Sequence, residues 1–220
     1  MCYSFRMPID GAFDVYSSPE AELKRRNNEL EDKVHIDDLT QLFTRGYLRE
    51  KLNELIEELN NSKTERVAPL QAIFILRFDI DKFKLFNESP YNHTVGDDVL
   101  RAFAKYLKGI AKEKEDIVAR KGGDEFAIVM PIFRKGVNLE ELFETIKKRM
   151  KELFVLVTDK NGKERDLKVT ASIGYSAIQR GEFKTSEELI KEADIKERED
   201  KENQKSPHVF EIDKRHITQN

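Results

Sequence analysis

The sequence predicts an α+β fold, with a ferredoxin-like central antiparallel sheet flanked by helices and preceded by a helical stem. Three observations support this prediction. Helical and strand-like hydrophobic patterns follow one another along the chain. The run 70–78 is almost continuously apolar, which is typical of a central strand buried on both faces. Two short strand patterns flank Gly122-Gly123 and indicate a hairpin, so neighbouring strands should be antiparallel.

The N-terminal region precedes the sheet and has two parts. Residues 1–18 show no periodicity and contain Pro8 and Gly11, so we expect an irregular segment. Residues 19–36 begin after a serine cap and predict a helix. Its apolar positions are spaced as in two heptads, at Leu23, Leu30 and Val34. Two heptads are compatible either with a short parallel coiled coil that makes a homodimer or with a helix packed on its own domain.

The remaining elements follow in order within a domain that we place at 37–220. An amphipathic stripe predicts the first helix, and the strand 70–78 follows it. A second helix precedes the hairpin, and Asn161-Gly162 predicts a later turn between two paired strands. We expect the helices to pack on one face of the sheet. The predicted helices are 45–60, 96–112, 139–154 and 186–202, and the predicted strands are 70–78, 117–120, 125–130, 155–157, 167–177 and 209–212.

Composition limits the function before any motif is considered. The 220 residues suffice for one substantial domain, and 39 basic against 42 acidic residues leave a net charge of −3. A coat of mixed charge is typical of a solvated surface and also fits the ion-pair networks of thermophilic proteins. We therefore expect no specific nucleic-acid binding. One cysteine, no long apolar run and no secretory signal predict a cytoplasmic chain without a membrane segment.

Acidic residues in two separate segments suggest a metal site. Asp79, and with it Asp81, ends the apolar strand, so a carboxylate should lie at the edge of the sheet. Asp124 and Glu125 directly follow the two glycines of the hairpin. If the hairpin lies beside the strand, three carboxylates converge and repel one another unless a cation is present. Oxygen ligands of this kind suit Mg²⁺, and the site would suit phosphoryl transfer.

These segments resemble the GGDEF domains, which are the catalytic domains of diguanylate cyclases. The signature itself is followed and preceded by further family motifs in the right order, over roughly 170 residues. The matching segments are 37–40 (DDLT), 79–84 (DIDKFK), Asn87, 93–97 (HTVGD), 122–126 (GGDEF), 169–174 (VTASIG) and 193–194 (AD). The resemblance implies a palm-type fold like that of nucleotide cyclases. It also implies condensation of two GTP molecules into cyclic di-GMP, with release of pyrophosphate.

The resemblance also implies roles for individual residues. Asp79, Glu125 and the Ile80 carbonyl would hold Mg²⁺ or Mn²⁺. Asp124 would lie beside the reacting 3′-hydroxyl, either as a further metal ligand or as a proton acceptor. Glu125 would share the catalytic edge with it.

The GTP itself would contact a larger set of residues. Asn87 and Asp97 would hydrogen-bond the guanine, with His93 close to the same nucleotide. Backbone N–H groups at a turn into a helix would cradle the phosphates, with basic side chains beside them and glycines that permit close approach. This phosphate set is Lys82, Phe83, Lys84, Arg120, Gly122, Gly123, Lys201 and Lys205, where Lys205 replaces the family's usual arginine.

The sequence departs from the family pattern at four places. The loop 88–92 is one residue longer than usual, and segment 195–206 keeps the cations of the family motif but loses its apolar residues. Lys121 replaces an aromatic or aliphatic residue. Glu113 replaces the arginine of the family's RxxD inhibitory motif, so we expect no product feedback there.

Three functions therefore remain open from the sequence. The first is a Mg²⁺-dependent diguanylate cyclase that acts as a dimer through the N-terminal helix. The second is a degenerate GGDEF module that binds GTP or a partner without turnover. The third is a palm-type nucleotidyltransferase that makes another oligonucleotide.

Overall fold

The computed structural model describes residues 35–61, 68–88, 91–150, 153–203 and 211–212. The predicted irregular segment 1–18, nearly all of the stem 19–36, and Lys205 lie outside the described residues. Among the helices of these ranges, none combines the length and apolar character needed to span a membrane.

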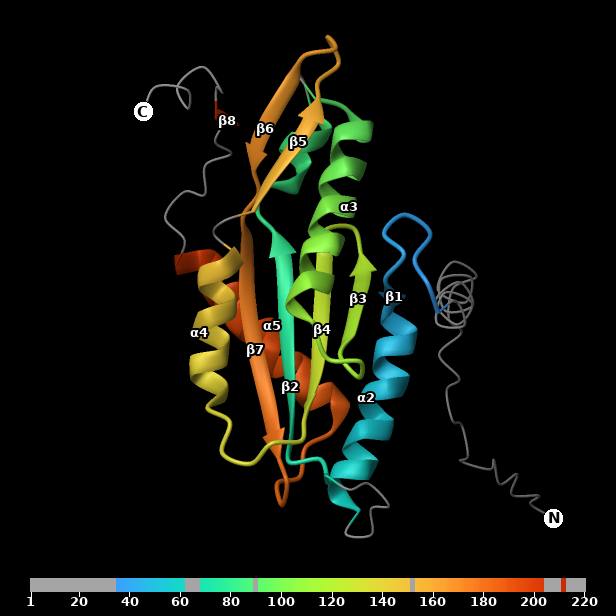
Figure 1. Cartoon of the computed structure of the whole chain (residues 1–220), viewed down its shortest axis with the longest axis vertical. Helices are drawn as coiled ribbons and strands as arrows, with labels where there is room; N and C mark the ends of the chain where they lie inside the picture. Colours follow the sequence, from blue (N-terminus) through green and yellow to red (C-terminus); the bar gives the residue numbers. More distant parts are fainter. Residues whose placement is uncertain (1–34, 62–67, 89–90, 151–152, 204–210, 213–220) are drawn as a thin grey trace, which may run out of the picture.

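A five-stranded sheet forms the centre of the molecule, with strand order β1-β3-β4-β2-β7 (Figure 1). Strand β1 runs parallel to β3, and the other neighbours are antiparallel. The four strands β3-β4-β2-β7 have the ferredoxin-like order, so the predicted fold class is confirmed. The bounds are Phe43–Thr44 for β1, Ala72–Ile80 for β2, Ile117–Gly122 for β3, Glu125–Ile132 for β4 and Ala171–Gln179 for β7.

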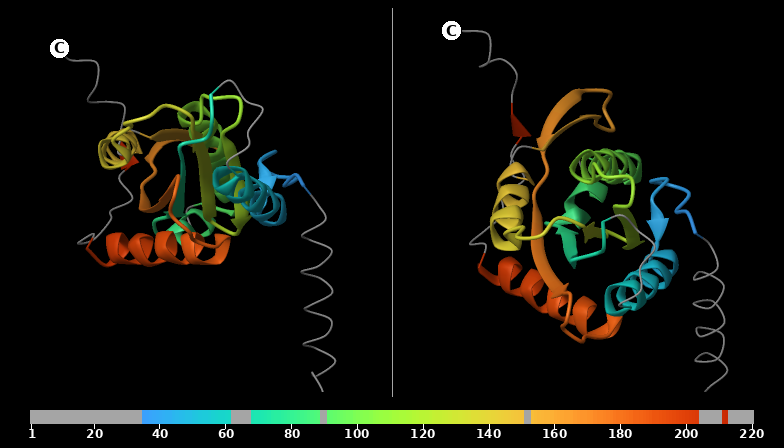
Figure 2. Two further views of the ribbon diagram at one scale, coloured as in Figure 1. Left: turned by 90° about the horizontal axis from the view of Figure 1, so that it is seen from below. Right: turned by 60° about the horizontal axis from the view of Figure 1, so that its bottom comes forward.

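Helices cover both faces of this sheet, so the expectation that they share one face was wrong (Figure 2). The α3 and α4 helices pack on one face, and α2 and α5 pack on the other. The reason lies in β2, where Phe74 and Leu76 face one layer while Ile73 and Ile75 face the other. A strand that is apolar on both faces needs cover on both. The bounds are Arg45–Asn60 for α2, His93–Ile110 for α3, Leu139–Met150 for α4 and Ser186–Asn203 for α5.

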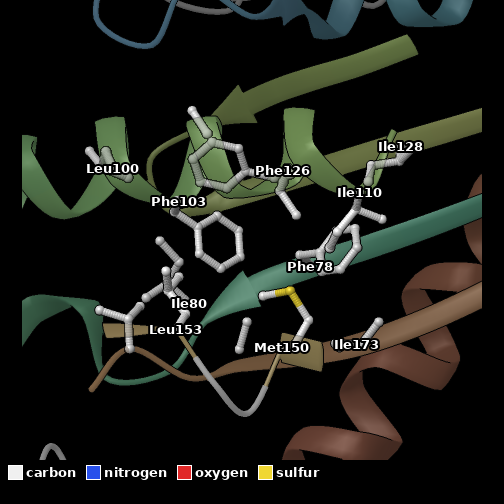
Figure 3. Close-up of a cluster of buried hydrophobic side chains, with 14 of the residues drawn as sticks. Phe78, Ile80, Leu100, Phe103, Ile110, Phe126, Ile128, Met150, Leu153 and Ile173 are labelled. Carbon is white, nitrogen blue, oxygen red and sulfur yellow. The ribbon is translucent and has the colours of Figure 1, made fainter. Parts of the chain in front are cut away.

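The larger core lies between the sheet and helices α3 and α4. Figure 3 shows the rings of Phe78, Phe103 and Phe126 gathered between β2, β4 and α3. The ring centroids of Phe103 and Phe126 are 5.0 Å apart, and those of Phe78 and Phe103 are 6.3 Å apart. Helix α3 begins three residues before the predicted start because Asn92 caps it, its Oδ1 accepting from the Val95 N–H at 3.1 Å.

A second, smaller sheet corrects the prediction for residues 155–177. It contains β5 (Phe154–Thr158), β6 (Glu164–Lys168) and β8 (Glu211–Ile212), in the order β5-β6-β8. The predicted strand 167–177 is therefore two strands, β6 in the small sheet and β7 in the central one. Leu167 and Val169 are both buried where the chain passes between the sheets, so the apolar pattern continues through the break. Likewise, α4 ends at Met150, and Phe154 begins β5 instead of ending the helix.

Candidate functional site

The three predicted carboxylates come from adjacent strand ends at one edge of the sheet. In the β2–β4 ladder Asp79 stands opposite Glu125, and residues directly opposite in an antiparallel pair share a face. The Ile80 N–H donates to the Asp124 carbonyl at 3.2 Å, which holds the hairpin against the end of β2. Two segments 45 residues apart thus bring Asp79, Asp124 and Glu125 to one edge.

The two glycines set the direction in which the chain enters β4. Gly122 has φ +139° and Gly123 has φ +54°, and L-residues rarely adopt either conformation. A Cβ on either glycine would meet nothing within 4 Å, so the requirement is conformational and not steric. The hairpin therefore needs glycine for the backbone geometry that places Asp124 beside Ile80.

Arg120 braces this hairpin. Its guanidinium donates to the Gly123 carbonyl at 2.8 and 3.0 Å and to both Asp37 carboxylate oxygens at 3.2 Å. Burial acts to raise the pKa of Asp37, but hydrogen bonds from Thr40 and the charge of Arg120 outweigh it and lower the pKa. That Arg120 adds positive charge for phosphates stays a prediction, and the structure shows its guanidinium in contact with the hairpin and with Asp37.

Basic side chains pair with the carboxylate edge. Lys201 on α5 donates to Asp79 Oδ1 at 2.6 Å, and Arg77 Nη2 contacts Glu125 Oε2 at 3.2 Å. Lys121 Nζ lies 3.5 Å from the same Glu125 oxygen. Each pair joins different elements, so the edge connects β2, the hairpin and α5.

The pKa values at this edge reflect burial first and then the neighbouring charges. Burial, followed by the carboxylates of Asp79 and Glu125, raises the pKa of Asp124. Burial also acts to raise the pKa of Glu125, but Lys121 and Arg77 outweigh it and lower that pKa. Burial would lower the pKa of Lys201, yet its hydrogen bond to Asp79 raises it. The negative charge is therefore compensated at Asp79 and Glu125 but less so at Asp124.

The donor chemistry of this edge fits a divalent metal. Carboxylate and carbonyl oxygens are the ligands that Mg²⁺ prefers. After burial, the neighbouring charges of Asp79 and Glu125 also act to raise the pKa of Asp124, as expected where carboxylates gather without a cation. Within the ranges that the structure describes, however, no three Asp, Glu, His or Cys side chains already close around one point as a metal cage. Mg²⁺ commonly takes only one or two protein carboxylates together with substrate phosphates, so an incomplete cage is compatible with it.

The residues predicted for guanine lie together at the start of α3. Asn87 ends the short 3₁₀ helix η1 (Phe83–Asn87), and Asp97 is on the first turns of α3. A Cβ at Gly96 would lie 2.2 Å from Asn87 Oδ1, so glycine is required for the Asn87 amide to rest on α3. The Asn87 side chain therefore lies against the residue that precedes Asp97. His93 is exposed at the first position of the same helix.

The predicted phosphate loop lies between β2 and η1. Lys82 has φ +52°, and the first hydrogen bond of η1 runs from the Leu85 N–H to the Lys82 carbonyl at 2.9 Å. The N–H groups of Phe83 and Lys84 come before this first hydrogen bond, so η1 itself offers them no carbonyl acceptor. The Lys84 side chain is 88% exposed and lies 3.6 Å from Glu88. Lys201, which was also predicted to bind phosphates, does not lie in this loop. Its ammonium donates a hydrogen bond to Asp79 at the carboxylate edge.

Sequence reasoning missed Arg77 as a member of this site. It is 3% exposed at the centre of β2, on the same face as Asp79, and Nε lies 2.8 Å from Asp194 Oδ1 on α5. The sequence did contain a signal, because Arg77 is a single cation inside an apolar strand. A charged residue is rarely buried unless it is paired, so such a position indicates an ion pair. Glu197, one helical turn before Lys201, was also missed; it is 7% exposed, and burial together with Asp79 raises its pKa.

Comparison with known proteins identifies a single family. Residues 34–207 match the family model described as the diguanylate cyclase GGDEF domain. The response regulator PleD of Caulobacter vibrioides is 36% identical over 170 residues, which cover 76% of this chain and 34% of PleD. The diguanylate cyclase TpbB of Pseudomonas aeruginosa is 31% identical over 138 residues, covering 63% of this chain and 30% of TpbB. The chain thus spans about a third of the length of these relatives.

A solved structure agrees with the sequence matches. The diguanylate cyclase SiaD of Pseudomonas aeruginosa, crystallised with its activator SiaC, superposes with a TM-score of 0.60 and 28% identity. The alignment covers 83% of this chain and 64% of SiaD. The described fold is therefore shared with a GGDEF-type enzyme.

Proposed function

Because the chain belongs to the diguanylate cyclase GGDEF-domain family, we propose that it condenses two GTP molecules into cyclic di-GMP and releases pyrophosphate. The observation that carries this proposal is the pairing of Asp79 with Glu125 in the β2–β4 ladder, with Asp124 held beside it by the glycine hairpin. The register of the β2–β4 ladder puts Asp79 and Glu125 on the same face, as an enzyme that gathers its acidic residues at one site requires. A slip of one residue would turn Glu125 to the opposite face of the sheet.

The proposed reaction forms two phosphodiester bonds. Each 3′-hydroxyl oxygen attacks the α-phosphorus of the other GTP, the bond to the β-phosphate oxygen breaks, and pyrophosphate leaves. Asp124, held beside the end of β2 by the hairpin, would accept the proton of the attacking hydroxyl. Two domains that face each other would supply the two reactants, so positioning would provide much of the rate acceleration.

Asp79, Glu125 and the Ile80 carbonyl are the proposed ligands for Mg²⁺ or Mn²⁺. When bound, such an ion would neutralise phosphate charge in the transition state. Lys201 contacts the Asp79 carboxylate that would hold the metal. We propose that its ammonium would contact the phosphates when GTP and the metal bind. Asn87 and Asp97 would hold the guanine edge, because an amide both donates and accepts while a carboxylate accepts two N–H groups.

A homodimer assembled through the N-terminal helix 19–36 remains part of the proposal. Two GTP-loaded domains have to meet, and a parallel pair of stems would bring them together. The described structure begins at residue 35, where the chain leads into the Asp37–Arg120 contact at the hairpin. A change in the stem would therefore reach the hairpin through a short, hydrogen-bonded path.

One observation favours the alternative of a module that binds GTP without turnover. Lys201, Arg77 and Lys121 already pair with the carboxylates that would hold a metal. If these ion pairs persist in the presence of GTP and Mg²⁺, the site would bind nucleotide but not complete the metal centre.

The test is to incubate the purified protein with Mg²⁺ and each nucleoside triphosphate and to identify products by mass. We expect cyclic di-GMP from GTP alone, and its loss in Asp124→Asn. Asp98→Asn is the matched control, because Asp98 is a partly exposed aspartate on α3 that pairs with Arg101. GTP binding without product at any protein concentration would instead establish the binding module, and linear or adenine-containing products would indicate another nucleotidyltransferase.

A further inference from the structure

A basic pocket lies between α2 and α5 on the sheet face that also carries Asp79 and Glu125. Its volume is about 280 Å³. Four cationic side chains line it, Arg45, Arg49, Arg77 and Lys121, against a single acid, Asp194, and the other lining residues are aliphatic. When Glu125 and Glu187, which contact three of these cations, are counted as well, the cluster keeps one excess positive charge. An anion is the ligand that this excess would favour.

Arg77, in the pocket lining, has side-chain donors that no acceptor satisfies in this arrangement. Its side chain is 3% exposed, yet among the residues that the structure describes its Nη1 has no hydrogen-bond partner. Its Nε lies 2.8 Å from Asp194 Oδ1, but the two atoms are not aligned as donor and acceptor. A guanidinium carries five N–H donors, and leaving buried donors unsatisfied costs free energy. An oxygen-rich anion that drew the guanidinium away from Glu125 and into the pocket would supply acceptors for these covered donors.

The opposite wall of the pocket is equally suited to an anion. Arg45 and Arg49 are one turn apart at the start of α2, so they lie on one face of the helix. The N-terminal end of a helix carries partial positive charge, and the first turn of α2 contains no acidic residue. Arg49 also reaches across to Glu187 on α5 at 3.2 Å, so it stands at the junction of the two helices.

We propose that this pocket binds a phosphoryl anion, with Arg77 and Lys121 as its inner ligands and Arg45 and Arg49 as its outer ligands. The planar fork of arginine pairs with two oxygens of a phosphoryl group, and the remaining phosphoryl oxygens can accept from the other cations. Two sources share this chemistry. One is inorganic pyrophosphate, and the other is the phosphate of a guanine nucleotide whose base would rest on the aliphatic floor.

Occupancy of the pocket would be coupled to the carboxylate edge. Arg77 and Lys121 line the pocket and also contact Glu125 Oε2, at 3.2 and 3.5 Å. An anion would compete with Glu125 for both cations and release its carboxylate. This coupling rests on the proposed function, because it takes Glu125 as a metal ligand of the cyclase. The pocket itself does not depend on that assignment.

The binding test uses the full chain in EDTA, without GTP, by isothermal titration with pyrophosphate in one series and guanosine monophosphate in another. We expect saturable binding of at least one, weakened about tenfold in Arg45→Gln and in Lys121→Gln, since each removes a charge-assisted hydrogen bond. Lys201→Gln is the matched control, because it removes a cation from the proposed substrate phosphates but not from the pocket. Circular dichroism and urea midpoints like those of the parent show that the variants fold.

The outcomes separate the pocket from the proposed active site. Binding that is lost in Lys201→Gln but retained in Arg45→Gln and Lys121→Gln would overturn the proposal, as would no binding of either anion at millimolar concentration. Because these titrations measure binding without metal or turnover, they hold whether or not cyclic di-GMP is formed. The coupling predicts severalfold tighter anion binding in Glu125→Gln, and an unchanged affinity would overturn it.

Discussion

The Lys201 ammonium donates a hydrogen bond of 2.6 Å to the Asp79 carboxylate, although 122 residues separate them along the chain. Asp79 ends the central strand and Lys201 lies near the end of α5, so this contact fixes the helix relative to the carboxylate edge. It also makes Lys201 a competitor for the carboxylate that we propose as a metal ligand.

Lys201→Gln should therefore strengthen metal binding but lower kcat/KM for GTP. Without the competing ammonium, Mn²⁺ should bind the protein alone severalfold more tightly, because Asp79 loses its cationic partner. kcat/KM for GTP should fall about tenfold, since a charge-assisted contact to phosphate is lost. Electron paramagnetic resonance of free Mn²⁺ measures the first effect and product formation measures the second. Lys191→Gln, an exposed lysine on the same helix, should change neither by more than about twofold. Parallel losses in both quantities would contradict this model.

Gly174 is the point of closest approach between β7 and α5. A Cβ there would lie 2.1 Å from the Ala193 carbonyl oxygen and 2.2 Å from the Glu197 backbone nitrogen. Gly174→Ala should lower the free energy of unfolding by about 2 kcal/mol, because backbone atoms cannot yield as a side chain can. Gly109→Ala on α3, where a Cβ would meet nothing within 4 Å, should raise it by about 0.5–1 kcal/mol. Urea unfolding measures both, and equal effects of the two substitutions would refute the packing argument.

Two buried serines on β7 offer a second matched pair. Ser172 Oγ donates to Asp81 Oδ1 at 2.7 Å, and Ser176 Oγ donates to the Leu189 carbonyl at the same distance. Asp81 is only 4% exposed, so Ser172→Ala should destabilise by about 2–3 kcal/mol, as expected when a buried charged group loses a donor. Ser176→Ala, which removes a neutral hydrogen bond, should cost about 1 kcal/mol. Urea denaturation of both variants tests the difference, and a larger loss in Ser176→Ala would contradict it.

The Asp37 contact should make stability depend on pH. Its pKa lies below the ordinary value because Thr40 and Arg120 outweigh the opposing effect of burial. The folded state therefore binds this proton less readily than the unfolded state does. The resulting stabilisation is present above the ordinary pKa near 4 and disappears as the pH falls through the lower folded value.

Asp37→Asn should consequently lower the free energy of unfolding by about 1 kcal/mol at pH 7, and the difference from the parent should shrink near pH 3. Urea unfolding at the two pH values measures this. Asp38→Asn, at the exposed neighbouring aspartate, is the control and should show no such trend. A difference that stays constant between pH 7 and pH 3 would rule out the ionised Asp37 as its origin.

Much of the fold could be predicted from local sequence patterns. The helix Arg45–Asn60 was predicted with its observed bounds, and the strands on either side of Gly122-Gly123 form the expected hairpin. Periodicity and glycine conformation act over a few residues, so they can be read without knowing the fold. The break between β6 and β7 was missed because the buried residues Leu167 and Val169 continue one apolar pattern across two sheets.

The acids of the candidate site could be named from the sequence, but the ion pairs that its cations make could not. Asp79, Asp124 and Glu125 sit beside strand ends and glycines, which makes them visible in the sequence. The pairing of Lys201 with Asp79, and of Arg77 with Glu125 and Asp194, depends on where α5 crosses the sheet. Arg120 was predicted to add positive charge for phosphates, and only the structure shows its contacts with Gly123 and Asp37.

By itself, the sequence determined the order of the elements, the acidic motif and the family, because these depend on local pattern and spacing. Only the tertiary structure decided that helices cover both faces and that α2 and α5 enclose a pocket of four cations beside Glu125. The physical reason is that ion pairs and pockets arise from side chains on separate elements. Their meeting is set by the packing of buried surfaces and not by any spacing along the chain.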